Sequence, residues 1–300
     1  TVRVTVLYTP DGESGVRTLE FAIPFTVESD GHALPGCQHL TAETETEFLE
    51  ARMLNPRKIF THCKLVSHIT GYQRKPLEFC MDTEADSGLQ VEKRQEQQHA
   101  ILLTHIAEKD FTFTEEMNLS PGRAGAAELL TSQVSSTVTE TKIVGSKLIF
   151  KGVFSVSLLY RDNSGGCGSV TSELPFSQIM EVEGAVEGSA AGLQLQLTGT
   201  DFQIDGDDPE GRQISVTLYF HATALLREEQ ELTLLSDLYS TAHDLTYEAA
   251  PLNITSFCEN LSRRQTLREV LEIGVVAESI LALSAACGTV SVSREGSMAV

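Results

Sequence analysis

Val4-Thr5-Val6-Leu7-Tyr8 stands near the start of the chain, and the similar stretch Val156-Ser157-Leu158-Leu159-Tyr160 follows 152 positions later. Each stretch is followed by a polar, glycine-containing segment and then by a second match, Ile23-Pro24-Phe25 in one case and Leu174-Pro175-Phe176 in the other. Self-similarity at one long period is typical of duplicated domains, whereas solenoids repeat at much shorter periods. The sequence therefore predicts two copies of one domain.

Two further pairs of segments agree with this period. Asn55-Pro56-Arg57 aligns with Asp208-Pro209-Glu210-Gly211-Arg212, and Gly145-Ser146-Lys147 aligns with Gly296-Ser297-Met298. The alignment predicts a first, N-terminally incomplete repeat over 1–122 and a second repeat over 123–275. Residues 276–300 are then the leading strands of a further repeat, or a swapped segment. In this frame both ends of the chain fall inside a repeat, which fits either a piece of a longer repeat protein or a strand completed by another chain.

The residue pattern favours an all-β fold with minor α content, built as tandem β-sandwich-like domains. Apolar and polar residues alternate over 2–8, 148–160 and 213–220, which is typical of strands with one buried face. Pro24 and Pro175 interrupt the two return strands and predict an edge strand or a bulge. Ser120 to Ala127 reads as a linker, and two segments could be helical: Leu89 to Lys109 and Leu261 to Ile273.

Composition limits the classes of function. A formal net charge of −20 and a pI near 4.7 argue against binding to nucleic acid or anionic membranes, because phosphate groups need a cationic surface. No apolar run is long enough for a transmembrane helix, so we expect no membrane insertion. None of the six cysteines forms a CxxC pair or recurs in both repeats, so we expect isolated buried thiols in a reducing compartment, although cross-linking between chains stays open.

Two clusters contain residue types that bind metal ions. Asp201 to Asp208 holds four aspartates, which calcium could use, but the spacing is not that of a calcium loop, and an acidic hairpin turn is the simpler interpretation. His62 and His68 share a strand face with Lys64 and Val66, while Cys63 lies on the other face; surface histidines are expected there. Because the chain carries no nucleophile elbow, phosphate loop or zinc-protease helix, we expect no enzyme activity, no catalytic or metal-binding residues and no cofactor.

The second repeat resembles a known family. Lys142 to Gly152, Val156 to Tyr160, Leu174-Pro175-Phe176-Ser177-Gln178 and Val182-Glu183-Gly184 are similar to the SPOCS domain of SipL-like proteins, which are spore-coat morphogenetic proteins of clostridia. Arg212 to Val216 and Asp237 to Thr241 also look like this domain, and Leu54 to Ile59 is similar to the matching part of a preceding copy. The resemblance thus extends over nearly the whole chain as tandem copies.

The resemblance implies a structural scaffold of the endospore envelope, made in the mother cell and bound to other coat proteins, including a coat-basement ATPase. The alternative, suggested by the frame of the repeats, is a self-assembling subunit of a spore appendage or surface filament joined by strand exchange between chains, and a homo-oligomer is possible in either case. The residues singled out are architectural: Tyr8 and Tyr160 are expected to cap a strand at the core edge, and Pro24-Phe25 and Pro175-Phe176 are expected to form a bulge and an anchor.

Overall fold

The computed structural model describes residues 1–12, 15–28, 31, 34–86 and 88–259, together with 266, 268–270, 272, 294–295 and 298–299. The described part is built almost entirely of strands, which confirms the all-β prediction, and its one helical element is a short 3-10 turn, η1 (Leu34–Gly36). The strands are β1 (Val2–Tyr8), β2 (Arg17–Ile23), β3 (His39–Asn55), β4 (Lys58–Tyr72), β5 (Glu92–Asn118), β6 (Ala126–Val144), β7 (Lys147–Asp162), β8 (Cys167–Glu181), β9 (Ala190–Ile204), β10 (Gln213–Tyr239), β11 (Arg294–Glu295) and β12 (Met298–Ala299).

The chain divides into two compact units. Unit 1 contains Thr1–Pro24, Leu103–Glu228 and Cys258–Val300, and unit 2 contains Phe25–Leu102 and Glu229–Phe257. The long strands β5 and β10 each contribute to both units. These units group residues that are close in space, whereas the repeat boundaries describe similarity along the sequence, so the two divisions differ. The repeat boundaries stay a prediction.

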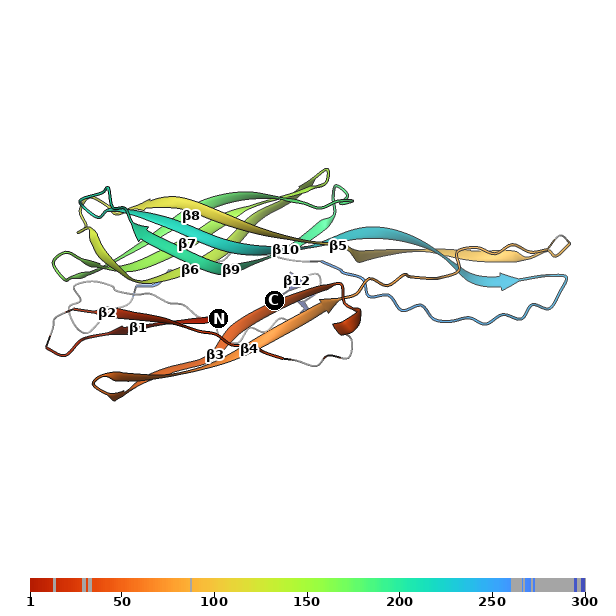
Figure 1. Ribbon diagram of the computed structural model, residues 1–300. Coiled ribbons are helices and arrows are strands. Elements are labelled where there is room, and N and C mark those ends of the chain that lie inside the picture. Colours follow the sequence, from red (N-terminus) through yellow and green to blue (C-terminus); the bar gives the residue numbers. More distant parts are fainter. Residues whose placement is uncertain are drawn as a thin grey trace. The chain divides into compact units, whose positions relative to one another are not determined.

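Unit 1 is organised around a β-sandwich. One sheet has the strand order β6-β7-β8 and the other the order β5-β10-β9, with antiparallel pairing in both β6-β7-β8 and β9-β10 (Figure 1). Alternate residues of β7 and β10 point into the space between the sheets, so that Ile214, Val216, Leu218 and Phe220 are buried as their spacing predicts. The core therefore lies between two sheets that each present one apolar face.

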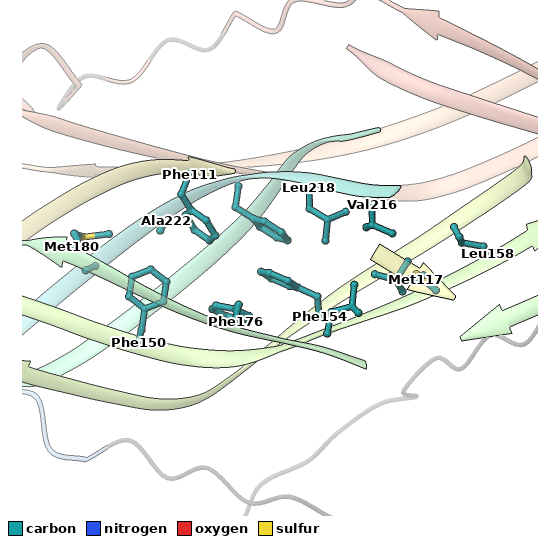
Figure 2. Close-up of a cluster of buried hydrophobic side chains, with 14 of the residues drawn as sticks. Phe111, Met117, Phe150, Phe154, Leu158, Phe176, Met180, Val216, Leu218 and Ala222 are labelled. Carbon is teal, nitrogen blue, oxygen red and sulfur yellow. The ribbon is translucent and has the colours of Figure 1, made fainter. Parts of the chain in front are cut away.

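Aromatic rings fill the centre of this core. The rings of Phe154 and Phe176 stack with their centroids 4.1 Å apart, and Phe154 also stacks on Phe220 of the facing sheet at 4.5 Å. Figure 2 shows Phe154, Phe176 and Phe150 on one side of the core, facing Leu218, Val216 and Ala222 on the other. Stacked aromatic pairs add to the free energy of burial, so this cluster stabilises the sandwich beyond the area that it buries.

The hairpins of the N-terminal part repeat those of the sandwich in register. Tyr8 pairs with Arg17 in β1-β2, and Tyr160 pairs with Gly168 in β7-β8. In β3-β4 the pairing skips Glu47 between Thr46 and Phe48, and in β9-β10 it skips Thr198 between Leu197 and Gly199. The bulge thus occurs at equivalent positions in β3-β4 and β9-β10. We call β1-β2 and β3-β4 the first-copy hairpins, and β7-β8 and β9-β10 the second-copy hairpins.

The short hairpin β11-β12 follows the same rule. Arg294 pairs with Ala299 and Glu295 with Met298, while Ile143 pairs with Leu148 and Val144 with Lys147 at the tip of β6-β7. Each pair of β11-β12 lies 151 positions after its counterpart. The pairing therefore agrees with the sequence alignment of Gly145-Ser146-Lys147 with Gly296-Ser297-Met298.

The structure corrects several expectations. The segment Leu89 to Lys109 is not helical, because most of it forms β5, which pairs in a sheet beside β10. Pro175 lies inside β8 opposite Val153 without a register shift, so the predicted bulge is wrong; β8 is instead an edge strand, which leaves the missing proline N–H harmless. Ser120 to Ala127 contains a turn that joins β5 to β6 within unit 1. The predicted helix over Leu261 to Ile273 lies almost wholly outside the described residues.

The two tyrosines expected to cap a strand differ. Tyr160 is 2% exposed, and its hydroxyl donates a hydrogen bond to the carbonyl of Ala124 at 3.1 Å. Tyr8, at the equivalent position, is 37% exposed. The same contrast separates Phe176, which is 5% exposed and anchors the core, from Phe25, which is 39% exposed. The expectation is therefore met in the second copy and not in the first.

Candidate interaction surface

The strands β3 and β4 form a two-stranded ribbon in unit 2 (Figure 1). The two faces of this ribbon carry different kinds of side chain. Because side chains alternate across a strand, the observed register assigns every residue of the ribbon to one face. One face carries no charged side chain, and we call it the uncharged face. Its members are Leu40, Ala42, Thr44, Thr46, Leu49, Ala51 and Met53 of β3 and Ile59, Thr61, Cys63, Leu65, Ser67, Ile69 and Gly71 of β4.

The opposite, charged face pairs its own side chains across the strands. The guanidinium of Arg52 lies 4.8 Å from the ring centroid of Phe60, and the Lys64 ammonium lies 5.7 Å from that of Phe48. The ring of His62 meets that of Phe48 edge-on at 5.6 Å. Cross-strand cation–π and aromatic pairs of this kind stabilise a ribbon locally. The charged face is thus partnered within the ribbon and faces water in the ordinary way.

The uncharged face exposes large apolar groups. Leu49 is 57% exposed and Met53 is 68% exposed, and Leu40 and Ile69 are also exposed. On β4 the face is half-buried at Cys63 and Leu65 and exposed at Ile69, whereas the equivalent β10 residues Leu218, Phe220 and Ala224 are buried. A contiguous apolar patch on a protein surface is usually a site where another protein binds. The uncharged face is therefore the candidate interaction surface.

The histidines of the ribbon lie where the sequence placed them, on the face opposite Cys63. His62 lies 3.9 Å from a carboxylate oxygen of Glu50, and His68 lies 3.8 Å from one of Glu45, and all four side chains are well exposed. In the parts of the chain that the structure describes, no three His, Cys, Asp or Glu side chains gather as metal ligands would.

The aspartate cluster forms the turn between β9 and β10. The Asp208 carboxylate accepts hydrogen bonds from the backbone N–H groups of Arg212, Gln213 and Glu210, and those from Arg212 and Gln213 contribute most to lowering the pKa of Asp208. Asp205 accepts the N–H of Asp207 at 2.9 Å. The turn between β3 and β4 uses Asn55 in the same way, because its side-chain oxygen accepts the N–H of Arg57 at 2.9 Å. These side chains shape hairpin turns, as the simpler interpretation of the cluster predicts.

A groove of about 480 Å³ in unit 1 is lined by residues of β1, β2, β6 and β9 and by Leu158. Arg3 in this groove pairs with Glu20 at 3.1 Å and lies 3.4 Å from the Thr200 hydroxyl. The lining holds Arg3 together with hydroxyl, carboxylate and apolar side chains.

The cysteines differ from expectation in burial. Cys63 and Cys167 are partly exposed, and Cys80 and Cys258 are exposed and not part of a disulfide, so these thiols are not the buried groups that the sequence predicts. Cys287 lies outside the described residues. Among the described residues, no helix has the length and apolar character needed to cross a membrane.

Sequence reasoning did not identify the uncharged face. The signal was present in the alternation of Leu40, Ala42 and Thr44 with Thr41, Glu43 and Glu45, but the bulge at Glu47 shifts the alternation by one residue. A fixed period of two therefore fails across the strand, and only the pairing reveals which residues share a face.

Comparison with known families agrees with the fold. The family model described as SipL, SPOCS domain, matches residues 125–205, which run from the start of β6 to the end of β9. No match is found among the curated proteins or the solved structures. This part of the chain is a SPOCS domain of the SipL family, which relates the protein to sporulation.

Proposed function

We propose that the protein is a non-enzymatic structural component of the bacterial endospore envelope and acts through contacts between protein surfaces. The family match supplies the link to sporulation, and the resemblance of the chain to spore-coat morphogenetic proteins supplies the envelope as the place of action. In this role the protein helps to assemble the envelope and catalyses no reaction.

The observation that carries the proposal is the uncharged face of β3-β4. Apolar side chains such as Leu49 and Met53 stand on a regular sheet surface, where they lose contact with water only if another surface covers them. Burial of such side chains stabilises a contact by roughly 25 cal/mol per Å² of apolar area. A sheet face of this kind suits a scaffold, because it binds an extended flat partner rather than a small molecule.

The charge of the molecule limits its partners. With a net charge of −20, the protein repels nucleic acid and anionic lipid, and attracts surfaces that carry positive charge. The partner implied by the family resemblance is a coat-basement ATPase made in the mother cell. We propose contact with that protein, and a place in the coat or envelope, as parts of the same function.

A fluorescent fusion in sporulating cells tests the proposal. The wild-type fusion is expected to collect around the developing spore, and a Leu49→Lys variant is expected to stay dispersed in the mother cell, because a charge on the uncharged face must be desolvated on binding. Thr70→Lys adds the same charge on the opposite face of the ribbon and serves as the matched control. Uniform distribution of the wild-type fusion through the cell at every stage of sporulation contradicts the proposal.

A further inference from the structure

We propose that the groove in unit 1 binds a neutral oligosaccharide, with Arg3 and Thr18 among the side chains that contact its hydroxyl groups. This site is separate from the uncharged face, and the inference goes beyond the proposed function. Binding of a sugar in the groove is measured on the purified chain, so it stands or falls independently of any role in the spore.

The groove is formed within one unit by segments far apart in the sequence. Its lining comes from β1 and β2 on one side of the sequence gap and from β6, β7 and β9 on the other, and all of these strands belong to unit 1. Its volume of about 480 Å³ lies within the range of roughly 300–1,000 Å³ that is usual for small-molecule sites. The groove is therefore large enough for an organic ligand.

Hydroxyl groups dominate the polar part of the lining. A hydroxyl group both donates and accepts a hydrogen bond, a guanidinium only donates and a carboxylate only accepts, so the lining offers every kind of partner that a sugar hydroxyl needs. The side chains that supply these groups are Thr5, Thr18, Thr131, Ser132 and Thr200, with the guanidinium of Arg3 and the carboxylates of Glu20 and Asp201.

The same lining disfavours other classes of ligand. An apolar molecule would leave these polar groups without water and without partners, which costs free energy. An anion would meet the carboxylates of Glu20 and Asp201 and the net charge of −20. The half-buried apolar side chains of Leu129 and Phe202 complete the lining and suit the C–H groups of a sugar ring. A neutral ligand with many hydroxyl groups fits the whole set.

Arg3 is held in position before any ligand binds. Its Nε lies 3.1 Å from a carboxylate oxygen of Glu20, and its Nη1 donates to the Thr200 hydroxyl at 3.4 Å. These two contacts connect the β1-β2 hairpin to β9 and use only part of the five N–H donors of a guanidinium. Arg3 thus presents oriented donors to the groove, and a side chain fixed in this way loses little entropy on binding.

Thr18 has a hydrogen-bonding capacity that the described part of the protein does not use. The Thr18 side chain lines the groove, but its hydroxyl oxygen is shielded from water and has no hydrogen-bond partner among the described residues. An unsatisfied buried hydroxyl is costly. Rotation of the side chain between its staggered conformations exchanges the methyl and hydroxyl positions, so a ligand in the groove can supply the missing partner.

The test is titration of the isotope-labelled full chain with cellotriose, maltotriose and N-acetylated chitotriose, followed by NMR and calorimetry. At least one of these sugars is expected to bind and to shift amide signals of β1, β2, β6 and β9. Arg3→Met is expected to weaken binding by about tenfold, because it removes charged donors. Arg17→Met changes the same residue type on the same hairpin, outside the lining, and serves as the matched control.

Thr18→Val separates a ligand contact from a structural role. The valine has nearly the shape of threonine but no hydroxyl, so the free protein is expected to melt at or above the wild-type temperature, since an unsatisfied buried group is removed. Sugar binding is expected to weaken by about three- to tenfold. Weaker binding by a variant that is no less stable supports a direct contact.

Three results would overturn the inference. The first is that none of the three sugars binds at millimolar concentration, and the second is that the amide shifts lie outside the four strands of the groove. The third is an affinity that neither Arg3→Met nor Thr18→Val changes. Binding of tetraglycine in place of the sugars would also overturn it, because the groove would then recognise an extended peptide.

Discussion

The first-copy and second-copy hairpins have the same pairing but different surroundings. In both copies the strands meet in the same register and the longer hairpin bulges at the same place, at Glu47 and at Thr198. Yet Leu218, Phe220 and Ala224 of β10 are buried, whereas the β3 side of the corresponding face is exposed and its β4 side is half-buried except at Ile69, which is exposed. A hairpin's register is therefore set by its own turn and alternation, whereas burial of its apolar face requires a second sheet.

The side chains at equivalent positions explain part of the difference. The second copy places aromatic rings at Phe154 and Phe220, where the first copy has Val2 and Leu65. The second copy also places Gly168 opposite Tyr160, where the first places Arg17 opposite Tyr8. A side chain on Gly168 would put its Cβ 2.5 Å from Tyr160 Cζ, so the glycine makes room for the ring to lie over the strand.

The largest expected effect is the loss of a core ring. Phe176→Ala is expected to destabilise unit 1 by about 3–5 kcal/mol, because it removes a buried side chain that stacks on Phe154. Phe25→Ala, at the equivalent exposed position, is expected to change stability by less than about 1 kcal/mol. Denaturant unfolding of both variants measures the difference. Equal losses of stability for Phe176→Ala and Phe25→Ala would show that the first-copy phenylalanine is packed in a core as tightly as the second-copy one.

A smaller loss is expected from filling the space under Tyr160. Gly168→Ala places a methyl group against the Tyr160 ring and is expected to cost roughly 1–3 kcal/mol, since the ring must move from its site. Gly122→Ala provides the control, because a Cβ there meets nothing within 4 Å. Thermal unfolding compares the two, and an unchanged melting temperature for Gly168→Ala would contradict the close packing of Tyr160.

The hydroxyl of Tyr160 provides a finer test of the same contrast. Tyr160→Phe removes the hydrogen bond to Ala124 and is expected to cost about 0.5–1.5 kcal/mol. Tyr8→Phe is expected to be neutral within error, because Tyr8 is largely at the surface. Denaturant midpoints of the two single variants measure the change in stability. A larger loss of stability from Tyr8→Phe than from Tyr160→Phe would contradict the conclusion that only the second-copy tyrosine is packed in a core.

The smallest effect concerns the two turns and depends on pH. The backbone N–H groups of Arg212 and Gln213 lower the pKa of Asp208 in the folded chain. The stability that this carboxylate contributes is therefore present above its unfolded pKa of about 3.9 and is lost as the pH falls through its lower folded pKa. Asp208→Asn is expected to melt below wild type at pH 7, with the difference disappearing in acid.

The turn of β3-β4 is the control for this pH dependence. It uses Asn55, which does not titrate, so the effect of Asn55→Ala is expected to stay constant between pH 7 and pH 2. Melting temperatures across that range test both expectations. A difference between wild type and Asp208→Asn that persists unchanged at pH 2 would mean that the charge of Asp208 plays no part in the turn.

Much of the fold was accessible from the sequence because hairpins are local. The alternation of Ile214, Val216, Leu218 and Phe220 and the glycine-rich turn after Tyr160 predicted strands and turns that the structure confirms. The segment Leu89 to Lys109 failed because its strand character depends on pairing with the distant β10, which no local pattern encodes. The uncharged face was missed for a related reason, since the bulge at Glu47 moves the alternation out of phase.

Amide hydrogen exchange, measured residue by residue on dilute monomeric protein, tests most directly the claim that the two copies share their pairing but only one is closed. The account predicts that amides of β10 over 214–226 exchange at least about a hundredfold more slowly than those of β4 over 59–71, because only the former open with the whole sandwich. Equal protection of the two strands in the monomer would contradict it, because the uncharged face would then already be covered within one chain.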